Sequence, residues 1–221
     1  MNRTLLIGAT GGIGNALLQA LRDRGADVTA LSRSGDGLDV TDERSVEDHL
    51  GALEPGFDAV LVATGALEIG GRRPEKSLRE IDAAAMAEQY ALNCIGPALV
   101  LKHSVRLLPR DRRSVFAALS ARVGSIGDNG LGGWYGYRSA KAALNQVLHT
   151  GAIELARSHP LAICVALHPG TVQTALTQRY LFRHPSVAPD EAAGHLLGVI
   201  DGLKVTDTGG FFDWRGTAVP W

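Results

Sequence analysis

Short apolar segments alternate along this chain with longer segments of helical periodicity, and this alternation restricts the fold more than any other feature. Several of the apolar segments are nearly continuous, as strands covered on both faces require. The alternation is typical of βαβ units and predicts an α/β fold, a doubly wound parallel sheet between two layers of helices. We expect strands at 4–8, 27–31, 59–63, 114–119, 162–167 and 210–214, with a short seventh at 38–40, and helices at 12–24, 42–53, 82–108, 135–157 and 190–203.

The composition is that of one globular domain. Its 221 residues, 45% of them hydrophobic, suffice for one large core, so we expect a single domain over 1–221. The 22 Lys and Arg residues nearly balance the 23 Asp and Glu residues. This balance predicts that neither nucleic acid nor an anionic membrane surface is a partner.

The cysteines, histidines and apolar runs exclude further classes. Cys94 and Cys164 lie far apart in apolar stretches, which predicts two buried thiols and a reducing compartment. The first apolar run is too short for a signal peptide, and no run approaches the roughly 18 residues of a membrane span, so we expect a cytoplasmic protein. The seven histidines show no metal-ligand spacing, and we predict no metal site.

A glycine-rich turn follows the first expected strand and precedes the first expected helix. Glycines there let the backbone approach a pyrophosphate, while the helix offers N–H groups and the positive end of its dipole. The turn lacks the Gly-Lys-Ser/Thr ending of a P-loop, which argues against ATP or GTP hydrolysis. It therefore predicts a dinucleotide site with contacts from Gly8, Thr10, Gly11, Gly12, Ile13 and Gly14.

The end of the second expected strand bears on the choice of dinucleotide. In such folds an acidic residue there binds the adenosine ribose of NAD, whereas a basic residue accommodates the 2′-phosphate of NADP. Here Ser32 and Arg33 follow the strand, and no carboxylate stands at the strand end. We therefore predict that NADP(H) is favoured over NAD(H), with Ser32 and Arg33 as contacts.

Tyr137 and Lys141 lie four residues apart in a helical segment, so both side chains face one side of the helix. A phenol titrates near 10, and a general acid working near neutrality needs a pKa about 3 units lower. A neighbouring fixed cation supplies part of that shift. The pair is therefore predicted to transfer a proton, with Lys141 lowering the pKa of Tyr137.

With these motifs in order, the chain resembles the short-chain dehydrogenase/reductase family over nearly its whole length, and a Rossmann-type fold is implied. Further matches are Asp39, Asn93 and the Pro169–Gly170 turn. The segments 119–135 and 211–214 resemble the C-factor-like and sniffer-like carbonyl reductase branch.

The resemblance implies hydride transfer between nicotinamide and a carbonyl or alcohol carbon, with Tyr137 as general acid or base. Lys141 would also hold the nicotinamide ribose, Asn93 would bind a water that links Lys141 to solvent, and Thr174 with the backbone near Val172 would hold the carboxamide. The remaining implied cofactor contacts are Asp39, Val40, Ala63, Thr64, Gly65, Pro169 and Gly170.

Two departures from the family pattern qualify this reading. Family members usually carry Ser-Ser after the strand that we expect at 114–119, but this chain has Ser120 followed by Ala121. Ser120 is the favoured catalytic serine and Ser125 the alternative. The Asn-Asn-Ala-Gly motif of the family is replaced here by Val62-Ala63-Thr64-Gly65.

The leading hypothesis is an NADP(H)-dependent oxidoreductase that reduces aldehydes or ketones. The first alternative is a catalytically weak dinucleotide-binding protein that acts as a signal or redox sensor, and the second is a sugar-nucleotide epimerase or dehydratase. We expect a substrate lid near 175–188, and the resemblance implies a homodimer or homotetramer through the long helices. Substrate identity and reaction direction do not follow from the sequence.

Overall fold

In the computed structural model, which describes residues 1–183 and 185–221, every pair of adjacent strands runs parallel. Six of the seven expected strands are formed, each within two residues of its predicted bounds. The strands are β1 (Arg3–Ile7), β2 (Asp27–Leu31), β3 (Ala59–Val62), β4 (Ser114–Leu119), β5 (Ala162–His168) and β6 (Phe211–Asp213).

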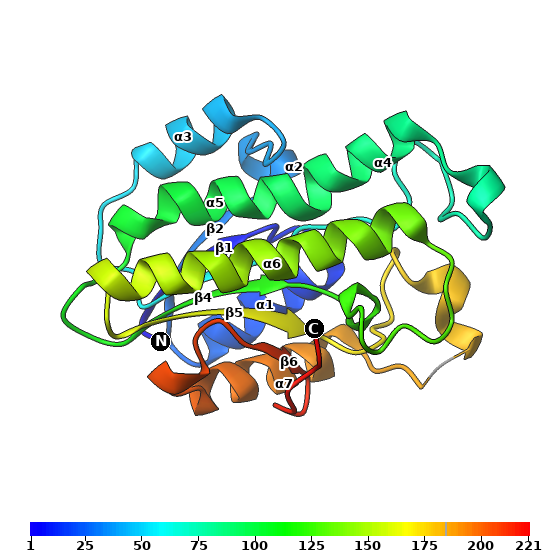
Figure 1. Ribbon diagram of the computed structural model, residues 1–221. Coiled ribbons are helices and arrows are strands. Elements are labelled where there is room, and N and C mark those ends of the chain that lie inside the picture. The colour runs from blue at the N-terminus through cyan, green and yellow to red at the C-terminus, as the bar shows by residue number, and fades with distance from the viewer. Residues whose placement is uncertain (184) are drawn as a thin grey trace.

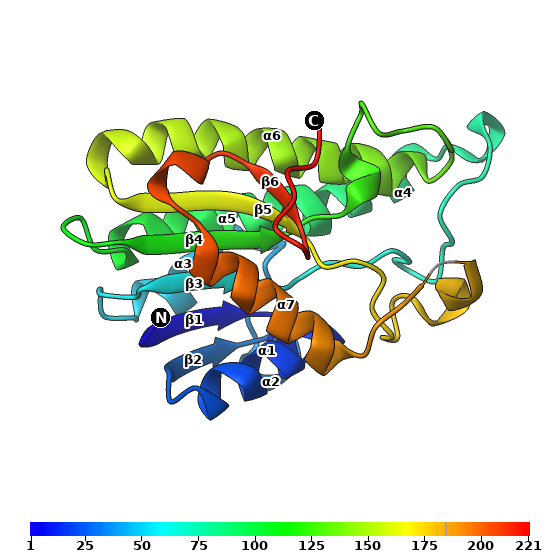
Figure 2. The same ribbon diagram turned by 90° about the horizontal axis from the view of Figure 1, so that it is seen from below.

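The strand order in the sheet is β2-β1-β3-β4-β5-β6. The chain therefore builds outward from β1 in one direction to β2 and in the other direction from β3 to β6, as Figure 2 shows. In such a doubly wound sheet the loops at the carboxyl ends of β1 and β3 diverge and leave a crevice, which is where ligands bind. This topology confirms the predicted Rossmann-type fold.

Helices cover both faces of the sheet and bury its alternating side chains. Figure 1 shows α3, α5 and α6 on one face and α1 and α7 on the other. Leu5 and Ile7 of β1 belong to the first core, whereas Leu6 between them belongs to the second. The helices are α1 (Gly12–Asp23), α2 (Arg33–Asp36), α3 (Glu43–Gly51), α4 (Ala83–Tyr90), α5 (Gly96–Ser104), α6 (Tyr135–Ser158) and α7 (Pro189–Gly202).

The seventh strand expected at 38–40 is not formed. Leu38 and Val40 are buried in the first core, so their apolar character reflects packing and not sheet pairing. Val40 lies against the start of α5, where a side chain on Gly96 would come within 2.8 Å of the Val40 Cγ2 atom.

The helix expected over 82–108 is divided. A π-helical turn at Ala91–Ile95 separates α4 from α5, and a 3₁₀ turn at Val105–Leu107 follows α5. Single π turns inside helices occur frequently at functional sites. Here the turn contains Asn93, which is fully buried.

Candidate active site

The predicted site residues gather at the carboxyl edge of the sheet, because all six strands are parallel and their following loops meet there. Gly8–Gly11 follow β1, Ser32 follows β2, Ala63–Gly65 follow β3, Ser120 follows β4 and Pro169 to Thr174 follow β5. Tyr137 and Lys141 reach the same edge from the amino-terminal part of α6, and Asn93 reaches it from the π turn.

The glycine turn has the geometry that close backbone approach requires. Gly8 has φ +87°, and a side chain there would lie 3.0 Å from the carbonyl carbon of Ala63. Gly14 packs so closely that a Cβ atom would lie 2.1 Å from the Gly8 oxygen. Gly11 caps the start of α1, and Ile13 packs against the core beneath that helix. The positive end of α1 therefore opens toward the crevice.

The loop after β3 completes the cradle. Gly65 has φ +150°, and a side chain there would lie 2.9 Å from the Asn93 Oδ1 atom and 3.4 Å from the Lys141 Nζ atom. The Thr64 hydroxyl is buried and has no hydrogen-bond partner within the described part of the chain. The exposed backbone at Gly65 and the unpaired buried hydroxyl of Thr64 both fit a bound dinucleotide.

The loop after β5 crosses the glycine turn. A side chain on Gly12 would lie 2.6 Å from the Thr174 Cγ2 atom, so Thr174 sits against the start of α1. Gly170, after Pro169, has φ +79°, and a side chain there would lie 3.0 Å from the Trp214 Cδ1 atom. Val172 is buried and pairs with Val187 in an isolated parallel bridge. This bridge closes the base of the expected lid.

The residues after β2 and those near Asp39 form the predicted adenosine end of the site. The Ser34 hydroxyl donates to the Thr10 hydroxyl at 3.0 Å and so joins the loops after β1 and β2. Arg33 is exposed and forms no ion pair with any residue that the structure describes. Asp39 accepts hydrogen bonds from the amide (2.9 Å) and hydroxyl (2.7 Å) of Thr41, which lower the pKa of its carboxyl group.

A carboxylate that sequence reasoning did not place at this end is Asp36. Its Oδ2 atom accepts the backbone N–H of Ser32 at 2.9 Å, and the Ser32 hydroxyl in turn accepts the N–H of Gly35 at 3.0 Å. The single turn of α2 thus brings an acidic group back to the strand end. No residue at the end of β2 carries a carboxylate, as expected from the sequence. The fold nevertheless brings the Asp36 carboxylate to the end of that strand.

Tyr137 and Lys141 lie together in the interior, as their spacing predicted. The Tyr137 side chain is 9% exposed and the Lys141 side chain 2%. The Lys141 Nζ atom lies 5.8 Å from the centre of the Tyr137 ring and donates to the Leu119 carbonyl at 2.8 Å. The two functional groups therefore share one buried space at the end of β4.

The pKa of Tyr137 does not follow the expected direction. Burial raises the pKa of the phenol, and burial lowers the pKa of the Lys141 ammonium to about 8. Desolvation disfavours the charged form of both groups. Burial is therefore the cause of the shift in the Tyr137 pKa, and the direction of that shift is opposite to the predicted lowering.

Asn93 is held by a network of three hydrogen bonds. Its Nδ2 group donates to the Ala66 carbonyl at 2.9 Å and to the Gln89 Oε1 atom at 2.7 Å, while its Oδ1 atom accepts the Ala66 N–H at 3.2 Å. Gln89 is fixed by its own bond to the Leu67 carbonyl at 3.0 Å. The amide oxygen of Asn93 is thereby held beside Gly65, to which the Lys141 ammonium is also close.

This arrangement has clear counterparts among known proteins. A family model described as enoyl-(acyl carrier protein) reductase matches residues 8–198. The 1-hydroxy-2-glutathionyl-2-methyl-3-butene dehydrogenase of Rhodococcus sp. (strain AD45) is 33% identical over 239 aligned residues, which cover 100% of both chains. The chain belongs to the short-chain dehydrogenase/reductase family. Membership of this family makes the protein an NAD(P)-dependent oxidoreductase.

Solved structures of short-chain dehydrogenases agree with the fold. A short-chain dehydrogenase/reductase from Burkholderia multivorans with bound NADP has a TM-score of 0.84 and 25% identity, and the match covers 99% of each chain. The carbonyl reductase Sniffer of D. melanogaster has a TM-score of 0.86 and 20% identity, with 100% of each chain covered. This chain therefore shares its fold with Sniffer, a member of the branch that the sequence resembles.

Neither candidate serine forms a hydrogen bond with Tyr137 within the described part of the chain, and each hydroxyl has another partner. The Ser120 hydroxyl is buried and donates to the Asn145 Oδ1 atom at 2.6 Å. The Ser125 hydroxyl accepts the Asp128 N–H at 3.1 Å and stabilises the turn after β4. Ser120 points toward α6 because it continues the alternation of Phe116 and Ala118, whose side chains face the same core.

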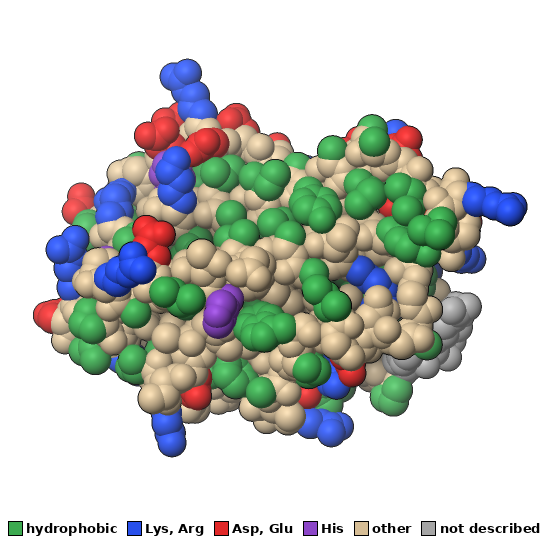
Figure 3. Space-filling view, viewed as in Figure 1, with side chains coloured by type: hydrophobic (Ala, Val, Ile, Leu, Met, Phe, Trp, Pro, Cys, Tyr) green, Lys and Arg blue, Asp and Glu red, His purple; other side chains and the backbone are tan. Residues whose placement is uncertain are grey.

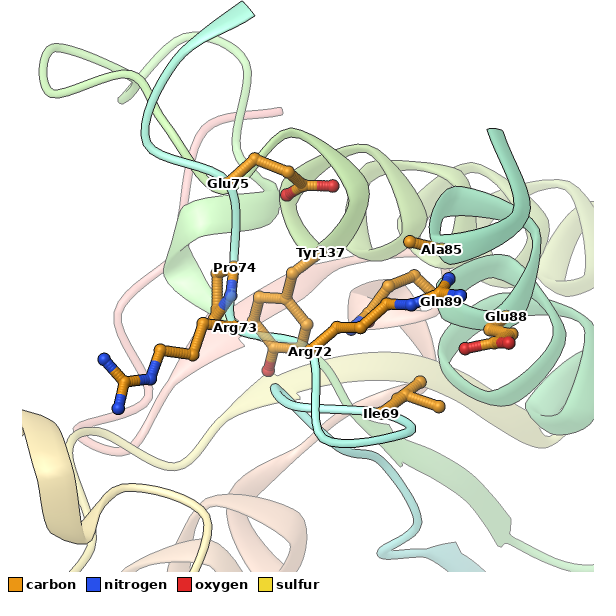
Figure 4. A pocket seen from close by; sticks show the side chains of 9 residues that line it. All are labelled: Ile69, Arg72, Arg73, Pro74, Glu75, Ala85, Glu88, Gln89 and Tyr137. Atoms are coloured by element: carbon orange, nitrogen blue, oxygen red, sulfur yellow. The ribbon is translucent and has the colours of Figure 1, made fainter. Parts of the chain in front are cut away.

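A pocket beside Tyr137 is lined by residues that sequence reasoning did not single out. Figure 4 shows Arg72 and Arg73 on opposite sides of the Tyr137 ring, with Glu75 near the start of α6. Gln89 could have been predicted from the sequence, since it precedes Asn93 by one helical turn and so lies on the same face of the helix. Glu75 carries none, because a loop residue has no periodicity. The residues that line the pocket are Ile69, Arg72, Arg73, Pro74, Glu75, Ala85, Glu88, Gln89 and Tyr137.

The expected lid near 175–188 contacts Glu68, which precedes the pocket residue Ile69, and Trp134, whose ring meets that of Tyr137. The Tyr180 hydroxyl donates to the Glu68 carboxylate at 3.2 Å, and Arg179 pairs with the same carboxylate at 3.3 Å. The Tyr180 ring lies edge-on to Trp134 with ring centres 5.2 Å apart. His184, which belongs to the predicted lid, lies outside the described residues.

Among the described residues, no group of three or more His, Cys, Asp or Glu side chains lies close enough to hold a metal ion. No helix in this part of the chain is both long and apolar enough to cross a membrane.

Proposed function

We propose that this short-chain dehydrogenase is an NADP(H)-dependent reductase of aldehydes or ketones, with Tyr137 as its general acid. The observation that supports this most is the burial of Tyr137 and Lys141 in one space beside the Gly65 cradle. The Tyr137 phenol carries its proton near neutrality, which is the form that gives a proton to a carbonyl oxygen, and its raised pKa makes it a weaker acid than the sequence predicts.

Each residue then has a defined task. When bound, the nicotinamide cofactor supplies the hydride. Tyr137 donates a proton to the carbonyl oxygen, Lys141 would hold the cofactor ribose, and Asn93 lies with Lys141 beside Gly65. Ser120 supports the helix through Asn145. In the reverse direction, alcohol oxidation, the Tyr137 phenolate accepts the proton.

The preference for NADP(H) rests on Arg33, which is exposed and unpaired within the described residues, and on the NADP bound by the Burkholderia relative. A guanidinium group recognises phosphate well. Asp36 opposes this preference, but its carboxylate accepts the Ser32 amide, which directs it toward the protein.

The substrate side of the pocket supports a partly anionic carbonyl or alcohol compound. Arg72 pairs with Asp82 at 3.3 Å, whereas Arg73 pairs with no acidic residue that the structure describes. The Rhodococcus relative is named for a glutathionyl alcohol, which carries carboxylates. We propose that Arg73 binds such a group and that Trp134 and Tyr180 pack against the apolar part of the substrate.

Self-association through the long helices is part of the proposal. On the face seen in Figure 3, hydrophobic side chains spread across the middle and most charged side chains lie toward the edges. Ile95 next to α5 is 48% exposed and Ile153 on α6 is 55% exposed. A homodimer or homotetramer would cover them. The buried free thiols of Cys94 and Cys164 fit a reducing compartment such as the cytoplasm.

Cofactor binding is tested by comparing thermal shifts with NADPH and NADH. A ligand at 100 times its Kd adds about 2.7 kcal/mol to the free energy of unfolding. We expect NADPH to stabilise more than NADH at equal concentration. No shift with either dinucleotide would contradict the dinucleotide site, and a larger shift with NADH would contradict the role of Arg33.

Catalysis is tested by measuring NADPH oxidation with a panel of aldehydes and ketones, half of which carry a carboxylate. We expect turnover by the wild type and at least 1,000-fold less by Tyr137→Phe, with NADPH affinity changed less than threefold. Dinucleotide binding without turnover would favour the alternative, a signalling or redox-sensing protein. Ala121 at the usual serine position supports that alternative, whereas the Tyr137, Lys141 and Asn93 arrangement supports the enzyme.

A further inference from the structure

The helix that carries Tyr137 begins without a cap of its own. Trp134 occupies the N-cap position of α6, its side chain caps no backbone group, and the first turn holds no acidic residue. The first N–H groups of a helix have no partner within the helix, and burial without a partner is costly. The start of α6 therefore needs an acceptor from elsewhere in the chain.

Glu75, in the loop between β3 and α4, supplies that acceptor. Its two carboxylate oxygens accept the N–H of Gly136 at 3.3 and 3.2 Å, and its backbone carbonyl accepts the N–H of Trp134 at 2.5 Å. The Glu75 residue is only 7% exposed. A carboxylate at a helix N-terminus also interacts favourably with the helix dipole.

Gly136 lets the carboxylate come this close. A side chain at Gly136 would lie 2.9 Å from the Glu75 Oε1 atom and 3.3 Å from the Gln89 Cγ atom. Figure 4 shows the Glu75 carboxyl group beside the start of α6 and the Tyr137 ring directed into the pocket that Glu75 and Gln89 also line. The contact therefore lies one residue from Tyr137.

The same contact holds a strained residue. Trp134 has φ +54° and is the one residue other than glycine with positive φ in the described chain. This conformation is unfavourable for a bulky side chain and persists where the surroundings fix it. The Trp134 ring meets the Tyr137 ring edge-on at 6.4 Å and the Tyr180 ring of the lid at 5.2 Å.

We propose that Glu75 is a positioning residue for catalysis, which caps α6 from outside the helix and so fixes Tyr137 and Trp134 relative to the substrate. Its effect on turnover rests on the function proposed above, whereas its effect on the helix does not. Glu75 acts through Gly136 and Trp134 and need not touch the substrate.

The test compares Glu75→Ala and Glu75→Gln with the control Glu80→Gln. Glu80 belongs to the same segment and also accepts a backbone N–H, that of Lys76 at 2.9 Å, but it is exposed and forms no hydrogen bond with α6 in the described part of the chain. For each variant we would measure kcat and KM at saturating NADPH, the Kd of NADPH, and amide hydrogen exchange over 135–141.

We expect Glu75→Ala to lower kcat about 10-fold to 100-fold, since small misplacement of a catalytic group has effects of that size. The Kd of NADPH should change less than twofold, and exchange over 135–141 should become about tenfold faster. Glu75→Gln should restore part of kcat, because its amide oxygen still accepts the Gly136 N–H. Glu80→Gln should match the wild type in every measurement.

Wild-type kcat and exchange in Glu75→Ala would overturn the proposal. If that variant does not fold, Glu75→Gln and Gly136→Ala decide, and wild-type values in both would overturn it equally. A wild type without reductase activity would contradict the proposed function instead, and the exchange rates over 135–141 would then still decide whether Glu75 caps α6.

Discussion

The Ser120 hydroxyl donates a 2.6 Å hydrogen bond to the Asn145 Oδ1 atom, and both residues are buried. Asn145 follows Lys141 by one turn of α6, so this bond ties the end of β4 to the helix that carries Tyr137 and Lys141. The Asn145 Nδ2 group has no partner within the described residues. The Ser120 hydroxyl therefore supplies a partner for the oxygen of the buried Asn145 amide but not for its nitrogen.

Ser120→Ala is expected to affect stability more than chemistry. It leaves the Asn145 oxygen unpaired in the interior, which costs about 1–3 kcal/mol of unfolding free energy. We expect kcat to fall less than tenfold. Urea unfolding and initial rates check this, and Ser158→Ala, on the same helix near its end, is a control. A 1,000-fold loss of kcat at unchanged stability would instead assign Ser120 the catalytic role.

Ala121→Ser is expected to raise activity. It restores a hydroxyl at the position where the family usually carries its catalytic serine, next to the end of β4. A hydrogen bond to the developing oxyanion contributes up to about 100-fold in comparable sites, so we expect a gain in kcat of about tenfold. Steady-state reduction of the preferred aldehyde measures it. Unchanged or lower kcat in a variant with wild-type stability would contradict the expectation.

Local patterns of the sequence predicted the parts of the site that depend on local geometry. The spacing of Tyr137 and Lys141 fixes their common face because a helix has 3.6 residues per turn. The glycine turn follows β1 directly, and its place follows from the βα connection. The apolar run at Leu38 predicted a strand that is not formed, since periodicity does not distinguish a short strand from a buried loop.

The remaining parts depend on contacts between distant segments. Glu75 meets Gly136 across 61 positions of sequence, and no motif links them. The direction of the Ser120 hydroxyl depends on which face of β4 packs against α6. Asp36 returns to Ser32 through the single turn of α2, and the direction of the Tyr137 pKa depends on how deeply α6 buries the phenol.

Arg33 and Asp36 are expected to shift cofactor preference in opposite directions. Arg33→Ala removes the guanidinium that would meet the 2′-phosphate and should weaken NADPH binding about tenfold to 100-fold, with little effect on NADH. Asp36→Asn removes a negative charge from the same loop and should strengthen NADPH binding severalfold. Fluorescence titration with both dinucleotides measures this. Equal losses for NADPH and NADH in Arg33→Ala would contradict it.

The buried ammonium of Lys141 is expected to lower the free energy of unfolding at neutral pH. Its pKa is about 8 in the folded protein, because of burial, and near 10.4 in an unfolded chain. Between these values the unfolded chain binds more protons, so the free energy of unfolding rises with pH from about 8 to 10. At pH 7 the buried ammonium costs the folded state about 3 kcal/mol by this difference.

Lys141→Met should therefore be more stable than the wild type at pH 7, by roughly 1–3 kcal/mol, and should lose the rise in stability above pH 8. Its kcat should fall at least 100-fold, because the ribose and the proton pathway lose the ammonium. Urea unfolding at pH 7, 9 and 10 measures the first two effects. Lys102→Met is the control, since the Glu43 carboxylate raises the pKa of this exposed lysine and gives it no such rise. Parallel stability curves for Lys141→Met and wild type would show that Lys141 is not desolvated as the structure indicates.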